Sequence, residues 1–122
     1  MKGLLMTIDE LVVEASAAKD RFWFIQSFEI TARTDATITL CFMIAADLFV
    51  QIFFSRRSKR FNMALIGASG RLYGRDREHG LWHRHPFEEP EKHEATPDGV
   101  SSRPINQFLA EVEEILIKHT LI

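Results

Sequence analysis

The segment from Arg75 to Glu94 concentrates the side chains that could take part in acid–base or ligand chemistry. Together with arginines, carboxylates and a tryptophan, it holds four of the five histidines of the 122-residue chain: His79, His83, His85 and His93. Histidine changes its charge near neutral pH, and its neutral ring is a common metal ligand. The segment therefore indicates a proton-transfer site, a metal site or a solvated polar loop.

The spacing within this segment predicts which side chains meet. His83 and His85 are two residues apart, so on an extended strand both point to one side, while Arg84 points to the other. His93 follows a proline-containing stretch that could return it to the same place. Asp76 precedes the histidines and could orient one of their rings through a ring N–H.

One hypothesis is the cleavage of RNA without a metal or another cofactor. One histidine would take the proton of a ribose 2′-hydroxyl, and another would protonate the leaving oxygen. We expect His83 and His85 in these roles, with Asp76 and His93 as supporting groups. Arg75 would bind the phosphate and stabilise its developing charge. The other residues expected to bind the substrate are Arg77, Arg84 and Tyr73.

Two alternatives stay open beside this hypothesis. A divalent transition metal could be held by three ligands with one position left free. The candidate ligands for such a metal are His83, His85, His93 and Glu89. In the other alternative the histidines are merely solvated, and the chain is a non-enzymatic binding module.

The distribution of charge favours an anionic partner near the histidines. The net charge of the whole chain is −2, but residues 55–86 carry eight basic and two acidic side chains, a net of +6. The flanking parts of the chain are both acidic. A positive block beside the candidate site suits RNA or a phosphate ester.

Length and composition limit the class of protein. A chain of this length has room for one core, so we expect a single domain over residues 1–122. One cysteine excludes an internal disulfide framework. The N-terminal residues meet carboxylates too soon for a signal peptide, and no apolar run is long enough to cross a membrane. We therefore expect a cytoplasmic protein with no membrane contact.

Periodicity predicts the elements that position the site. Thr7 and Glu10 have the spacing of a capping box, followed by helical spacing over about 7–19. Alternation then predicts five strands, the first beginning at Arg21 and the others near 37–44, 48–54, 61–66 and 71–77. Residues 86–104 contain four prolines and predict a long loop. A second helix begins at Pro104, and Glu111 is expected on its outer face.

These elements predict an α+β fold in which an antiparallel five-stranded meander is packed by the N-terminal and C-terminal helices as a two-layer sandwich. The other face of the predicted sheet carries more apolar side chains than an open face should, namely Trp23, Ile25, Phe49 and Phe53. This pattern predicts a homodimer built on that face.

The C-terminal half of the chain resembles the TumE-like toxin family of prokaryotic toxin–antitoxin modules. The resemblance rests on Tyr73-Gly-Arg75-Asp76, His83-Arg-His85-Pro86, His93 and the amphipathic C-terminal helix. Arg77 stands where the family pattern has an asparagine, so the chain would be a divergent member. The resemblance implies a growth-inhibiting toxin that acts on RNA, an endoribonuclease, with a cognate antitoxin as its partner.

Overall fold

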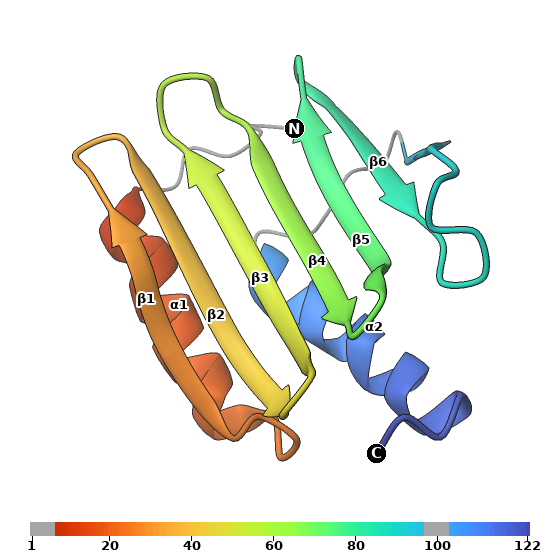
Figure 1. The fold of residues 1–122 in the computed structure, drawn as a ribbon. Coiled ribbons are helices and arrows are strands. Elements are labelled where there is room, and N and C mark those ends of the chain that lie inside the picture. The colour runs from red at the N-terminus through yellow and green to blue at the C-terminus, as the bar shows by residue number, and fades with distance from the viewer. Residues whose placement is uncertain (1–6, 97–102) are drawn as a thin grey trace.

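The computed structural model describes residues 7–96 and 103–122, which form two helices and seven strands. All seven strands join one antiparallel sheet, in which their order in space is their order along the chain. Both helices lie against the same face of this sheet (Figure 1). The elements are α1 (Ile8–Arg21), β1 (Ser27–Arg33), β2 (Thr37–Ala45), β3 (Leu48–Ser55), β4 (Phe61–Gly67), β5 (Gly70–Glu78), β6 (Leu81–His85), β7 (Glu94–Ala95) and α2 (Pro104–Lys118).

The start of α1 is fixed by the capping box that the sequence predicts. The backbone N–H of Glu10 donates to the Thr7 hydroxyl at 3.0 Å, and the backbone N–H of Thr7 donates to the Glu10 carboxylate at 2.7 Å. These two bonds satisfy N–H groups for which the first turn of a helix offers no partner. The predicted helix is confirmed, and it continues to Arg21.

The start of α2 depends on the neighbouring helix. The N-cap residue Arg103 makes no side-chain cap, whereas Glu14 of α1 accepts a hydrogen bond from the backbone N–H of Asn106 at 2.9 Å. Burial raises the pKa of Glu14, partly opposed by its backbone hydrogen bonds. Glu14 therefore links the two helices.

In the described part of the chain, neither helix is both long and apolar enough to cross a membrane.

The core lies between the sheet and the two helices. Strands β2, β3 and β4 alternate between buried and more exposed residues, as expected for a sheet with one covered face. The helices contribute the residues of their inward-facing sides. Side chains buried to 1% exposure or less include Leu40, Phe42, Ile52, Met63 and Phe108.

The prediction of an α+β fold with an antiparallel meander is confirmed, but the predicted number of five strands is wrong. A turn at His79 and Gly80, both with positive φ, lets the chain reverse after β5 and form β6. The chain then returns to pair two residues as β7 within the stretch predicted to be entirely loop. The result is one open seven-stranded sheet with helices on one face, and not the five-stranded sandwich that the sequence predicts.

The first strand begins later than predicted, at Ser27 instead of Arg21. The preceding residues turn, with the N–H of Ile25 bonded to the carbonyl of Phe22 at 3.2 Å, and Ile25 is buried in the core. Trp23 is exposed and donates to Glu113 of α2 at 2.6 Å. Neither Trp23 nor Ile25 therefore belongs to the uncovered sheet face, which weakens the argument for a homodimer there.

The capping box leads to a prediction about stability. Thr7→Ala removes the side-chain acceptor, so we expect the free energy of unfolding to fall by about 1 kcal/mol. Urea denaturation followed by circular dichroism measures this change. Val13→Ala is the matched control on the same helix, because Val13 is 69% exposed and should change stability by no more than about 0.5 kcal/mol. Equal unfolding free energies for the two variants would contradict the assigned cap.

Candidate functional site

The alternation of side chains along β5 and β6 divides the predicted site between the two faces of the sheet. Successive residues of a strand point to opposite faces, so Arg75 and Asp76 cannot share one. Asp76 pairs with His83, and Arg75 pairs with Arg84. The first pair lies on the open face, which we define as the sheet face without helices, and the second pair lies on the helix face. Of the predicted site residues in these strands, Asp76, His83 and His85 lie on the open face, and Tyr73, Arg75, Arg77 and Arg84 lie on the helix face.

On the open face, Asp76 lies between two histidines of β6. Its Oδ2 is 3.0 Å from Nε2 of His85, and its Oδ1 is 3.8 Å from Nδ1 of His83. The side chain of His85 is 2% exposed, whereas that of His83 is 29% exposed. Of these two rings, His83 is therefore the one that solvent and a ligand can reach.

His93 joins this cluster from the loop between β6 and β7. The centre of its ring is 4.2 Å from that of His85 and 5.8 Å from that of His83, and both contacts are edge-on. His93 is exposed. The pairing of β7 with β6 returns the chain to this position. The histidine cluster consists of His83, His85 and His93, while His79 occupies the β5–β6 turn.

Both ring nitrogens of His85 are occupied. Nδ1 is 3.0 Å from the carbonyl oxygen of Pro90, and Nε2 faces Asp76. A carbonyl oxygen only accepts, so Nδ1 must carry a hydrogen in this contact. Nε2 then meets Asp76 either as N–H against a carboxylate or as a lone pair against a carboxylic acid. In both arrangements His85 holds Asp76 and the β6–β7 loop in place, and it has no nitrogen left for a substrate.

Arg71 also lies on the open face, although it is not among the site residues that the sequence predicts. Leu65 pairs with Tyr73, but the next residue, Ile66, pairs with Arg71, so β5 contains one extra residue at this point. This bulge turns Arg71 to the open face, whereas regular alternation would place it on the same face as Tyr73. Its Nη2 donates to the carbonyl of Pro90 at 3.2 Å. A one-residue bulge has no signature in this sequence that would have identified Arg71.

A hollow of about 220 Å³ adjoins the histidine cluster on the open face. It lies above Ala64 of β4, whose small side chain leaves space above the sheet. The open-face side chains around it are Gln51, Phe53, Asn62, Ile66, Arg71, Asp76 and His85. The histidine cluster therefore borders a depression of limited size, lined by both polar and aromatic groups.

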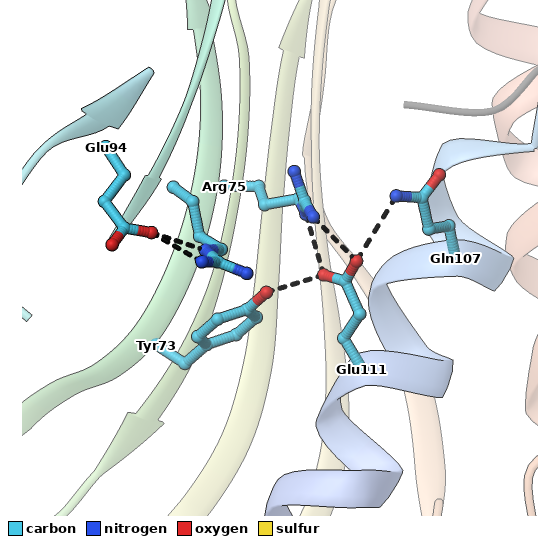
Figure 2. A network of polar contacts seen from close by, with 6 residues as sticks. Tyr73, Arg75, Glu94, Gln107 and Glu111 are labelled. Carbon is cyan, nitrogen blue, oxygen red and sulfur yellow. Dashed lines mark hydrogen bonds and ion pairs between the residues drawn. The ribbon is translucent and has the colours of Figure 1, made fainter. Parts of the chain in front are cut away.

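On the helix face, Glu111 of α2 gathers three side chains (Figure 2). Arg75 binds it through two bonds, Nε to Oε1 at 2.7 Å and Nη2 to Oε2 at 2.8 Å. The Tyr73 hydroxyl donates to Oε1 at 2.7 Å, and Gln107 donates to Oε2 at 3.2 Å. The expectation that Glu111 faces outward is wrong: the helix turns it toward β5. This network is structural in character, since it joins the sheet to α2.

The environment of this network shifts the pKa values of its members. Burial acts to raise the pKa of Glu111, but hydrogen bonds from Arg75 and Tyr73 outweigh burial and lower it. Burial and the hydrogen bond to the Glu111 carboxylate both raise the pKa of Tyr73. Burial acts to lower the pKa of Arg75, and the hydrogen bonds to Glu111 reverse this effect and raise it. Arg75 and Glu111 are therefore both ionised at neutral pH.

The other two arginines on the helix face also have intramolecular partners. Arg84 Nε donates to Glu94 Oε1 at 2.9 Å, and Arg77 Nη1 donates to the backbone oxygen of Lys59 at 3.0 Å. The sheet itself thus separates the histidine cluster from Tyr73, Arg75, Arg77 and Arg84. The structure does not bring the predicted phosphate-binding residues together with the predicted catalytic ones.

The geometry also bears on the alternative of a metal site. Across residues 7–96 and 103–122, no group of three or more His, Cys, Asp or Glu side chains is arranged to hold a metal ion. His85 offers no free lone pair while it keeps its two hydrogen bonds. Glu89 is exposed, in a turn where its N–H bonds to the carbonyl of Pro86 at 3.2 Å.

Comparisons with known proteins give no further identification. A scan against protein-family models, a search of curated proteins and a search of solved structures each gave no match. The resemblance to TumE-like toxins therefore depends on the residues of the C-terminal half alone.

The lowered pKa of Glu111 leads to a prediction about acid stability. Because its pKa is lower in the folded than in the unfolded chain, Glu111 contributes stability that is present above its ordinary pKa of 4.5 and is lost as the pH falls through the folded value. Glu111→Gln should reduce the unfolding free energy at pH 7 by about 3 kcal/mol. It should also flatten the fall of stability in acid.

Urea denaturation at a series of pH values from 7 to about 3 tests both effects. Glu114→Gln is the matched control, because Glu114 is exposed on the same helix. This control should keep the stability and the pH dependence of the original chain. If the Glu111 and Glu114 variants gave parallel curves, the assigned role of the network would be wrong.

Proposed function

We propose that this chain is a cytoplasmic TumE-like toxin that cleaves RNA without a metal, at the histidine cluster on the open face. The observation that carries the proposal is the pair of accessible rings, His83 and His93, with centres 5.8 Å apart beside the carboxylate of Asp76. Two imidazoles at this separation can lie within hydrogen-bond reach of one phosphodiester, as acid–base cleavage of RNA requires. The cognate antitoxin is the proposed protein partner.

In the proposed reaction, His83 is the general base and His93 the general acid. His83 accepts the proton of the ribose 2′-hydroxyl, whose oxygen attacks the phosphorus and forms a 2′,3′-cyclic phosphate. The bond from phosphorus to the 5′-oxygen breaks, and His93 gives that oxygen its proton. Asp76 supports His83 from the Nδ1 side, which leaves Nε2 for the substrate.

The proposal assigns new roles to three residues of the site, since His93 moves from a supporting group to the general acid and both His85 and Arg71 also change. His85 becomes a positioning residue, because its ring is buried and both of its nitrogens are engaged. Arg71 becomes the phosphate-binding arginine in place of Arg75, because Arg71 shares the open face with the histidines and Arg75 is bound to Glu111. A guanidinium beside the reacting phosphate would stabilise the charge that develops on its oxygens.

Cleavage by the purified protein tests this proposal. In the presence of a chelator, we expect single-stranded RNA to be cut to products that end in 2′,3′-cyclic phosphates. His83→Ala and His93→Ala should each reduce the rate about 100-fold or more, because general acid–base catalysis contributes on the order of 10² to 10⁴. His79→Ala is the matched control, an exposed histidine in the β5–β6 turn, and should keep the rate. A rate unaffected by His83→Ala would refute the proposal.

Growth of a bacterial host that expresses the chain tests the toxin role. The original chain and His79→Ala should arrest growth, whereas His83→Ala at the same protein level should allow it. Optical density and immunoblotting measure growth and expression. Arrest by all three proteins would favour the alternative, a non-enzymatic binding module whose effect does not depend on catalysis.

A further inference from the structure

The residues beside the histidine cluster form straight rows across the open face. One row runs through Phe53, Asn62, Asp76 and His83, which pair in that order from β3 to β6. The next row runs through Gln51, Ala64, Gly74 and His85 in the same way. With strands about 4.8 Å apart, Phe53 lies roughly 14 Å from His83 along its row. The hollow lies over the second row and borders the first.

Ala64 of the second row lies in the floor of this hollow. The space above its partner Gly74 is taken up by neighbouring side chains. A Cβ at Gly74 would lie 3.3 Å from Cδ of Arg71 and 3.8 Å from the His85 ring. The side chains of Arg71 and His85 thus close one end of the hollow, while Gln51 and Phe53 border the other end.

The chemistry of this lining matches a nucleobase. Phe53 is partly exposed on a face where its row neighbour is the polar Asn62, so its ring is available for stacking. Aromatic rings on an open sheet bind unstacked bases of single-stranded RNA, and side-chain amides such as that of the exposed Gln51 bond to base edges. The volume of about 220 Å³ is below the roughly 300–1,000 Å³ of sites for drug-sized ligands. It suits one planar ring system.

The charges around the hollow suit the backbone of such a ligand. Arg71 is exposed at its edge. Arg60 lies immediately before β4, and its charge is partly balanced by Glu78 at 3.4 Å. Arg57 and Lys59 are exposed in the β3–β4 turn, outside the lining of the hollow, and of the residues that the structure describes Asp76 is the one carboxylate within that lining. A single strand of RNA, with phosphates outside and one base inward, is complementary to this arrangement.

We propose that the hollow is a nucleobase subsite that receives one unpaired base of single-stranded RNA, stacked on Phe53 and bonded at its edge by Gln51, with Arg71 on the adjoining phosphate. The base would lie next to the phosphate that is cleaved at His83 and His93, so the subsite adds a substrate class to the function proposed above and rests on it for its position. Base pairing would prevent entry, so duplex RNA is excluded.

Binding of an RNA that cannot be cleaved tests the subsite separately from catalysis. A fluorescent single-stranded oligonucleotide with 2′-O-methyl groups lacks the attacking hydroxyl, and fluorescence anisotropy measures its Kd. Phe53→Leu keeps an apolar side chain but removes the stacking ring, and we expect binding to weaken roughly tenfold or more. Ala64→Leu should fill the hollow and weaken binding similarly. Circular dichroism and urea denaturation confirm that each variant is folded.

Phe49→Leu is the matched control, because Phe49 lies on the same strand and face as Phe53 but outside the hollow. It should bind within about twofold of the original chain, and Phe53→Trp should bind at least as tightly. An equal loss from the Phe49 and Phe53 changes would overturn the subsite, as would tight binding of a duplex of the same sequence.

The outcomes separate the subsite from the proposed reaction. Phe53-dependent binding without cleavage of ordinary RNA would refute the reaction and support the subsite. Cleavage that depends on His83 with no effect of Phe53→Leu or Ala64→Leu on binding would support the reaction and refute the subsite. Light scattering gives the oligomeric state: a dimer that Phe53→Leu dissociates, together with no oligonucleotide binding, would make the open face a contact between copies and refute the subsite.

Discussion

The two-residue period of β5 and β6 is the constraint on which the rest of the molecule depends. Because Arg75 and Asp76 are neighbours on one strand, their side chains leave the sheet in opposite directions. Arg75 reaches Glu111 and attaches α2 to the sheet, while Asp76 reaches His85 and organises the open face. One strand thereby contributes side chains to both the core and the candidate site.

Much of the fold follows from local patterns, and the candidate site follows from them only in part. The capping box at Thr7 and the alternation of β2 to β4 depend on neighbouring residues, so the sequence predicts them. The same period predicts that His83 and His85 share a face. It also places Arg75 and Asp76 on opposite faces of the sheet, although their chemistry alone suggests that they share one site. The position of Arg71 depends on the bulge, and that of Glu111 on how α2 is rotated, and both are set by packing between distant segments.

The turn before β1 and the short β7 illustrate the same limit. Phe22 and Phe24 continue the alternating spacing of a strand, but they are buried in a turn that leads from α1 to the sheet. Prolines between β6 and β7 correctly indicate a loop, but not that its carbonyl at Pro90 is held by both His85 and Arg71. Those two donors fix a segment that composition alone would describe as irregular.

The pairing of β7 has a consequence for the solubility of the fold. An open sheet has two edge strands with unpaired backbone groups, which are templates for aggregation. Among the residues that the structure describes, the outermost strand beside the histidines is the two-residue β7, too short to recruit another chain along its length. At the opposite edge, β1 has an irregular register between Ile30 and Ala32, which interrupts its ladder. Both edges are therefore poor partners for a further strand, so the uncovered face can remain exposed without making the sheet prone to edge-to-edge growth.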